Sequence, residues 1–116
     1  MKHILIAIAT ASIAMTAVTA QAADLKKGQE LLVKGNCAAC HGEGMNKPVV
    51  AEYPKLAGQH ADYLYAALKA YKVTNNPNIG RSNAIMAGQA AQFSDRDLKD
   101  MAAYIASLPG NLVVKK

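Results

Sequence analysis

Large aromatic side chains are scarce in this 116-residue chain, which has no tryptophan, one phenylalanine and five tyrosines. A single domain of this length buries only roughly 60–70% of the surface of its unfolded chain. The scarcity therefore excludes a core built on aromatic packing. A large apolar ligand would fill the space that aromatic side chains leave.

Cysteine is also rare, because the chain has only Cys37 and Cys40. A disulfide between them would close too short a loop to add much stability. A structural zinc ion needs four nitrogen or sulfur ligands, and beyond the amino-terminal region only these two thiols, His41 and His60 are available. Zinc stays open as an alternative that would use every one of them.

Acidic residues are few, with 8 Asp and Glu against 13 Lys and Arg and a formal net charge of +5. The basic residues are scattered and do not interleave with aromatic ones, which argues against nucleic acid as a partner. Two interpretations of the lysines near the cysteines stay open: a basic rim that steers acidic partners, or a solvated surface. These lysines are Lys26, Lys27, Lys34, Lys47 and Lys55.

Long apolar runs are absent except at the amino terminus, where one extends over residues 4–18. It follows Lys2 and precedes Ala20-Gln21-Ala22, an order typical of a secretory signal peptide with its cleavage site. We predict a signal peptide at residues 1–22 and one domain at 23–116, with no transmembrane segment after cleavage. The run is shorter than the ~20 residues of a membrane-spanning helix, and an uncleaved anchor is the alternative.

The stretch Cys37-Ala38-Ala39-Cys40-His41 carries the chemistry. Two cysteines three positions apart, followed by histidine, match a site of covalent haem attachment. Each sulfur adds to a haem vinyl group, and the histidine binds the iron. A dithiol redox centre would be expected beside a βαβ pattern, but no alternating run flanks Cys37, so we predict one haem c joined through Cys37 and Cys40, with His41 as an axial ligand.

Helical spacing of apolar residues occurs in three segments, and we expect an all-α fold because no segment alternates like a strand. The first helix is expected at residues 24–34, ending near Gly35, and the second at about 59–71. The last begins after Ser94 and carries the apolar stripe Leu98, Met101, Ala102, Ile105 and Leu108. Residues 42–58 and 74–86 are expected to be loops.

The second axial ligand must come from elsewhere in the chain. Met45 is only four residues past His41, and at ~3.5 Å per residue the chain hardly rounds a porphyrin. Met101 belongs to the apolar stripe, which favours a place in the core. Met86 follows a proline-bearing loop that could bring its thioether over the iron, so we predict Met86, with His60 as the alternative.

These features together resemble the class I c-type cytochromes, in particular small bacterial monohaem members that are similar to one half of a dihaem cytochrome c. The resemblance implies the cytochrome c fold, four to five short helices wrapped around one covalently attached haem. It extends from residue 24 to residue 108, nearly the whole of the predicted mature chain. It rests on residues 37–42, the segment Tyr53-Pro54-Lys55-Leu56-Ala57-Gly58-Gln59, Met86, and residues 98–104.

The family resemblance also implies roles for individual residues. The Pro54 carbonyl would accept a hydrogen bond from the His41 imidazole, Leu56 would pack on the haem face, and Arg81 would contact a haem propionate. Gly28 would allow the first helix to cross close to Ala103 and Tyr104 of the last. The tryptophan that many mitochondrial-type relatives place near a propionate is missing here.

We therefore expect a bacterial periplasmic electron carrier and not an enzyme. Its expected partners are redox proteins, either membrane respiratory complexes or a periplasmic dehydrogenase or reductase. Two alternatives remain: a cytochrome subunit of a larger oxidoreductase, and a haem enzyme or gas-binding protein in which the sixth ligand leaves readily.

Overall fold

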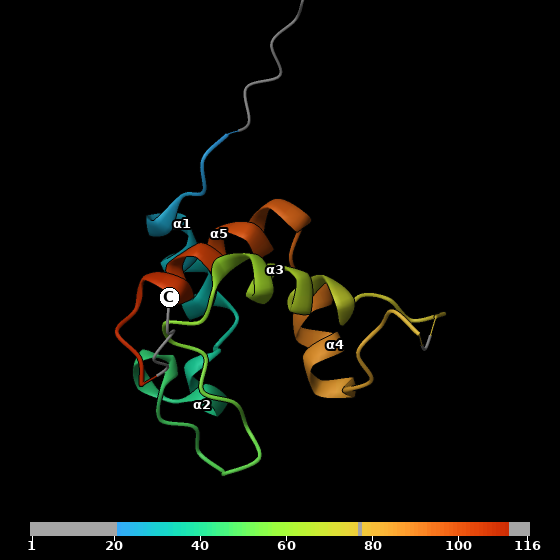
Figure 1. Ribbon diagram of the computed structural model, residues 1–116, viewed down its shortest axis with the longest axis horizontal. Coiled ribbons are helices and arrows are strands. Elements are labelled where there is room, and N and C mark those ends of the chain that lie inside the picture. The colour runs from blue at the N-terminus through green and yellow to red at the C-terminus, as the bar shows by residue number, and fades with distance from the viewer. Residues whose placement is uncertain (1–20, 77, 112–116) are drawn as a thin grey trace, which may run out of the picture.

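The computed structural model describes residues 21–76 and 78–111, and every described element is helical (Figure 1). The expected all-α fold of four to five short helices is thus confirmed for these residues. Most of the predicted signal peptide, residues 1–20, lies outside them. In chain order the elements are α1 (Leu25–Lys34), α2 (Ala38–His41), the 3-10 helix η1 (Glu43–Met45), α3 (Ala61–Ala70), α4 (Ala84–Ala91) and α5 (Asp95–Ser107).

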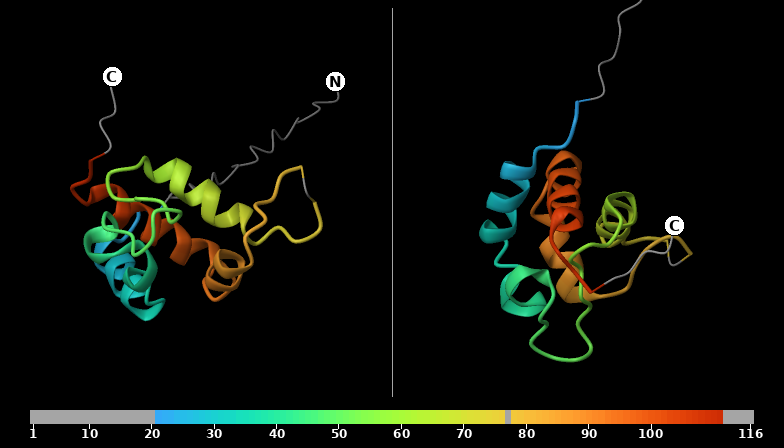
Figure 2. Two further views of the ribbon diagram at one scale, coloured as in Figure 1. Left: turned by 90° about the horizontal axis from the view of Figure 1, so that it is seen from below. Right: turned by 60° about the vertical axis from the view of Figure 1, so that its left-hand side comes forward.

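Helices α1 and α5 lie side by side although they stand at opposite ends of the domain sequence (Figures 1 and 2). A Cβ atom at Gly28 of α1 would lie 2.2 Å from the Asp100 carbonyl oxygen and 2.9 Å from the Tyr104 Cβ. Only a residue without a side chain permits this approach. The expected close crossing at Gly28 is confirmed, with Asp100 and Tyr104 as its partners.

The start of α5 is stabilised by a capping box. The Ser94 side chain accepts a hydrogen bond from the Asp97 N–H, and the Asp97 carboxylate accepts one from the Ser94 N–H. Lys27 of α1 lies 2.7 Å from the same carboxylate. The hydrogen bond from Lys27 is the main reason that the pKa of Asp97 falls from 3.8 to about 2. One acidic side chain therefore caps α5 and joins it to α1.

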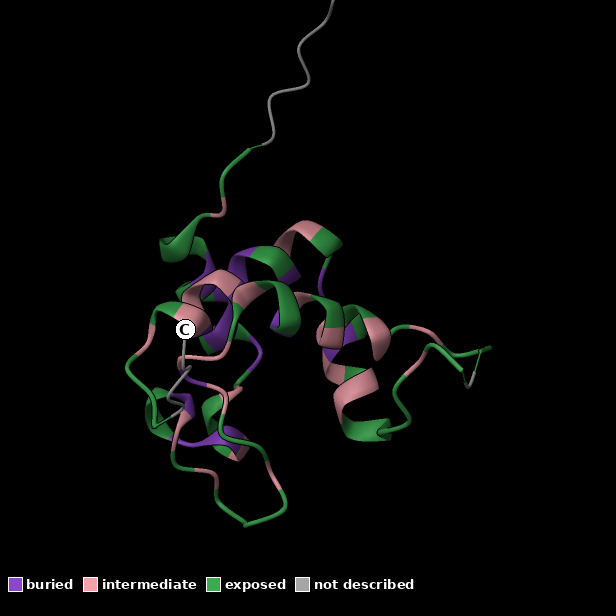
Figure 3. Ribbon diagram, in the orientation of Figure 1, coloured by how far each residue is buried: buried purple, intermediate pink, exposed green. Residues whose placement is uncertain are grey.

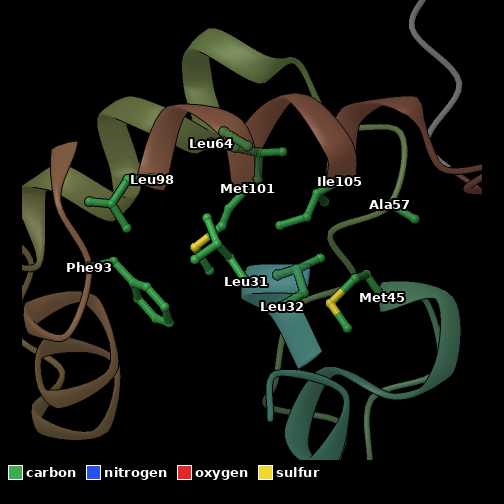
Figure 4. Packing of buried hydrophobic residues seen from close by; sticks show 10 residues of the cluster. Leu31, Leu32, Met45, Ala57, Leu64, Phe93, Leu98, Met101 and Ile105 are labelled. Atoms are coloured by element: carbon green, nitrogen blue, oxygen red, sulfur yellow. The ribbon is translucent and has the colours of Figure 1, made fainter. Parts of the chain in front are cut away.

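The core lies between α1, α5 and α3, and the buried faces of these helices point inward (Figure 3). Figure 4 shows Met101 and Ile105 of α5 close to Leu31 and Leu32 of α1. Met101 is 3% exposed, as its place in the apolar stripe predicts. The buried apolar cluster comprises Leu31, Leu32, Met45, Ala57, Leu64, Phe93, Leu98, Met101, Ala102 and Ile105.

One expectation about local structure was wrong. Residues 84–91 form α4, so Met86 lies on a helix and not in a loop. Asn83 begins this helix, and its side chain accepts a hydrogen bond from the Met86 N–H. The expected end of the first helix at Gly35 is confirmed. Gly35 has φ of −79°, and the left-handed residue is the next one, Asn36, with φ of 51°. Gly35 also allows Phe93 to approach, because a Cβ there would lie 3.0 Å from its ring.

The long segment between η1 and α3 has little regular structure, but its backbone is fixed at several points. The Met45 carbonyl accepts hydrogen bonds from the N–H groups of Leu56 and Ala57, at 2.8 and 3.0 Å. The Gly58 N–H donates to the Ile105 carbonyl of α5 at 3.2 Å. These bonds determine where the preceding residues of the segment, including Pro54, can lie.

Substitution of Gly28 by alanine tests the helix crossing. The added methyl group must push α1 away from the α5 backbone, so we expect Gly28→Ala to lower the free energy of unfolding by about 1–3 kcal/mol. Gly88 is the matched control, because a Cβ there meets nothing within 4 Å among the described residues. Gly88→Ala should raise stability by up to ~1 kcal/mol. Urea denaturation of both variants, with their cofactor bound, measures the difference; equal effects would contradict the steric explanation.

Candidate cofactor-binding site

A cleft lies between α2 and α4, which stand apart below α3 and α5 (Figure 1). The empty space between its lining residues, counted with the solvent to which it opens, is about 400 Å³. Almost every lining side chain is apolar, which suits a large flat apolar ligand. The lining residues are Leu32, Cys37, His41, Met45, Leu56, Leu68, Met86, Gln89, Ala90, Phe93, Leu98, Met101 and Ile105.

His41 is buried at the end of α2, and its ring orientation is determined by one hydrogen bond. Its Nδ1 lies 2.9 Å from the Pro54 carbonyl oxygen. A carbonyl can only accept, so Nδ1 is the donor, and in the neutral imidazole Nε2 then keeps a lone pair. A histidine held in this way is prepared to bind a metal through Nε2.

Gly42, which follows His41, brings the next segment tightly against α2. Its φ is 79°, and a Cβ there would lie 1.7 Å from the Lys47 carbonyl oxygen. A side chain would therefore be excluded both by backbone conformation and by lack of space. The Val49 N–H then donates to the Cys40 carbonyl at 3.0 Å, which fastens the returning chain to the cysteine pair.

Cys37 and Cys40 form no disulfide, and both are partly buried. Burial raises the pKa of Cys37 above its usual value. A dithiol redox centre needs a lowered thiol pKa, so this direction argues against that alternative. Zinc has no support either, since within residues 21–76 and 78–111 no three His, Cys, Asp or Glu side chains come together as a metal cluster.

Met86 lines the cleft from the first part of α4, whereas His41 lines it from the end of α2. Figure 1 shows these two helices standing apart. Met45 and Met101 also line the cleft, but both are buried members of the core, whereas Met86 is only partly buried. His60 is exposed just before α3 and is not among the lining residues. The structure thus brings Met86, Cys37 and His41 to one cleft and leaves His60 outside it.

The two remaining predicted residues have different environments. Leu56 lines the cleft. Arg81 does not, because its guanidinium lies over the rings of Tyr63 and Tyr71 and donates to the Tyr63 hydroxyl at 3.0 Å. The sequence reasoning also missed lining residues such as Gln89 and Phe93. The Asn83 cap and the alanine-rich run after it were the available signals for α4, and hence for Gln89.

The side chains present fit a covalently attached haem. The Cys37 thiol and the buried His41 imidazole line an apolar cleft. Cys40 is not among the lining residues, but it directly precedes His41 in α2. A thioether, a soft ligand that suits haem iron, reaches the same cleft from another helix. The fold and the cleft thus define a c-type cytochrome.

Comparisons with known proteins agree. The sequence family described as Cytochrome c matches residues 25–109. Cytochrome c4 of Stutzerimonas stutzeri is 35% identical over 105 residues, which cover 87% of this chain and 49% of the relative. Cytochrome c-554(548) of Halomonas halodenitrificans is 37% identical over 86 residues, 74% of this chain and 98% of the relative.

A solved structure is similar as well. The crystal structure of reduced recombinant cytochrome c4 from Pseudomonas stutzeri matches with a TM-score of 0.67 and 35% identity, over 78% of this chain and 48% of that one. The chain belongs to the cytochrome c family, and it resembles one half of a cytochrome c4. It spans about half the length of the cytochrome c4 that it matches. Its cofactor is covalently attached haem c, for which Cys37 and Cys40 form the expected motif.

Removal of both thiols tests the attachment. We expect Cys37→Ser with Cys40→Ser to abolish covalent haem, because serine cannot form the thioether bonds. Acid-acetone extraction followed by denaturing electrophoresis with haem staining measures what stays bound to the chain. Ala39→Ser is the control: it adds a hydroxyl at an exposed position of the same motif and should keep the stain. Covalent haem in the double variant would refute the assignment.

Proposed function

We propose that this protein is an electron carrier that accepts and donates one electron at a time through haem c, with His41 and Met86 as the axial ligands of the iron. The observation that carries the proposal is the single cleft shared by Cys37, His41 and Met86. When bound, the haem supplies an iron that cycles between its ferrous and ferric states.

His41 is prepared for its role by the Pro54 carbonyl. The hydrogen bond from Nδ1 holds the imidazole plane and directs the Nε2 lone pair to the metal. It also makes the imidazole a stronger electron donor to the iron. Because Pro54 belongs to a segment anchored to the Met45 carbonyl, this orientation is maintained by backbone hydrogen bonds.

Met86 and the apolar lining act together on the redox potential. A thioether donates weakly to ferric iron, and Met/His ligation raises the potential. Leucine, isoleucine and phenylalanine side chains around the cleft exclude water and so disfavour the ferric state, which carries one more positive charge than the ferrous state. With two protein ligands bound, the iron would have no open position for oxygen or peroxide, which is the reason to expect a carrier and not an enzyme.

Partner recognition is proposed for the exposed lysines near the motif. Lys27 is already engaged, because its ammonium lies 2.7 Å from Asp97. Lys47 and Lys55 are exposed on the segment that carries Pro54. A basic rim there would speed encounter with acidic redox partners, such as a respiratory complex or a periplasmic dehydrogenase or reductase.

We also propose export to the bacterial periplasm, with residues 1–22 as the cleaved signal peptide. The support is the order of Lys2, the apolar run and Ala20-Gln21-Ala22. Across the described ranges, 21–76 and 78–111, no helix combines the length and the apolar character needed to cross a membrane.

The axial ligand can be tested by spectroscopy. Ferric protein should show the weak sulfur-to-iron charge-transfer band at the red end of the visible spectrum, and Met86→Ala should lose it and lower the midpoint potential. Met45→Leu and Met101→Leu are matched controls that remove a sulfur at nearly constant volume and should keep the band.

Two results would contradict this proposal. A band that persists in Met86→Ala but disappears in one of the control variants would assign the sulfur to another methionine. Carbon monoxide binding by the native ferrous protein would instead favour a ligand-binding protein with a labile sixth position, since a firmly six-coordinate carrier should not bind it.

The intact mass of the protein purified from the periplasmic fraction tests processing and loading together. We expect the mass of residues 23–116 plus one haem. A mass that still includes residues 1–22 would support an uncleaved anchor. Copurification of a second polypeptide would show that the protein is a subunit of a larger oxidoreductase.

A further inference from the structure

Arg81 precedes α4 in the chain, and its side chain packs against the end of α3, outside the cleft. Its guanidinium carbon lies 5.7 Å from the centre of the Tyr63 ring and 5.6 Å from that of the Tyr71 ring. These distances are within the range of cation–π attraction. The guanidinium also donates to the Tyr63 hydroxyl at 3.0 Å. We call this group of three side chains the Arg81 clamp.

The backbone of Arg81 makes a further bond to the same helix. Its N–H donates at 3.1 Å to the Ala70 carbonyl at the end of α3, which also accepts a hydrogen bond from the Val73 N–H. Both the side chain and the main chain of Arg81 are therefore attached to α3. The clamp joins a residue that precedes α4 to a helix that is part of the core.

Only Ser82 separates Arg81 from Asn83, which begins α4. The Asn83 side chain accepts a hydrogen bond from the Met86 N–H at 2.9 Å. A short path of covalent and hydrogen bonds thus runs from α3 through the clamp to the backbone of Met86. Movement of Arg81 relative to α3 would be passed on to the first turn of α4.

Few other features hold this end of α4. The buried residue of the helix is Ala90, near its far end. At the near end Ala84 and Ile85 are exposed, with Ile85 at 59%. Burial of Ala90 therefore anchors the last turn of α4, whereas the Arg81 clamp anchors its first turn, before Met86.

We propose that Arg81 is a positioning residue for Met86: by clamping the start of α4 to Tyr63 and Tyr71, it keeps the thioether over the cleft. This inference rests on the proposed role of Met86 as axial ligand. It differs from the role that the family resemblance implies for Arg81, contact with a haem propionate. In the clamp, Arg81 influences the haem only through Met86.

The experiment measures how easily added imidazole displaces the methionine sulfur in the ferric haem-loaded protein. Loss of the charge-transfer band is followed as imidazole is added to parent, Arg81→Ala and Tyr63→Leu proteins. We expect Arg81→Ala to lower the imidazole concentration at half-loss about tenfold, equivalent to ~1.4 kcal/mol. Lys99→Ala, which removes an exposed cation from α5, is the control and should leave it unchanged.

A double-mutant cycle separates the clamp from direct contact with the haem. If Arg81 acts through the two tyrosines, its removal should matter less than about threefold in a background with both Tyr63→Leu and Tyr71→Leu, because both ring contacts and the hydroxyl bond are already lost. A tenfold effect in both backgrounds would mean that Arg81 acts elsewhere, for example on a propionate, and would overturn the inference. No effect of Arg81→Ala in the parent background would overturn it as well.

Two further readouts make the result unambiguous. The first is hydrogen exchange of the Met86 amide, which should be faster in Arg81→Ala than in the parent. The second is the unfolding midpoint. If Arg81 only stabilised the fold, Arg81→Ala would lower this midpoint and leave imidazole displacement unchanged. If the parent protein shows no charge-transfer band, the proposed ligand is wrong and the inference falls with it. If the band is present and insensitive to Arg81, only the inference fails.

Discussion

The close contact between α1 and α5 is the constraint on which the rest of the structure depends. With no side chain at Gly28, the two helices approach until backbone and side chains touch, and this brings Leu31 and Leu32 against Met101 and Ile105. Leu32, Met101 and Ile105 also line the cleft. The crossing that closes the core therefore also builds one wall of the cofactor site. It also sets the position of α2 beside this wall, because α2 follows directly from α1.

The opposite wall is held less firmly. Residues 46–58 and α4 contribute few buried side chains. Their positions depend on a small number of hydrogen bonds and caps, among them the bonds to the Met45 carbonyl, the Asn83 cap and the Arg81 clamp. Such segments belong to the less stable parts of a fold. In this protein they carry Pro54 and Met86. The proposed orientation of His41 and the proposed supply of Met86 thus rely on local interactions. The backbone that carries the cysteine pair and His41 instead follows directly from α1, which is part of the core.

The sequence alone predicted the strongest elements because their signals are local. Apolar spacing and the Ser94 cap located α5, and the family resemblance pointed to a close crossing at Gly28. Helix α4 was missed since residues 84–91 are small or apolar on nearly all sides and lack a clear helical stripe. The role of Phe93 in the cleft and the clamp on Arg81 depend on residues distant in sequence, which no local pattern reveals.

The sequence by itself determined the chemistry. Two thiols and a histidine within five residues specify covalent haem attachment, because this bonding depends on side-chain type and local spacing and not on the tertiary fold. Only the tertiary structure decided which distant groups meet that motif. It turned the Pro54 carbonyl toward His41, brought Met86 to the same cleft, left His60 outside it and placed Arg81 on Tyr63 and Tyr71. These contacts join residues far apart along the chain, so they exist only once helices and loops have packed together.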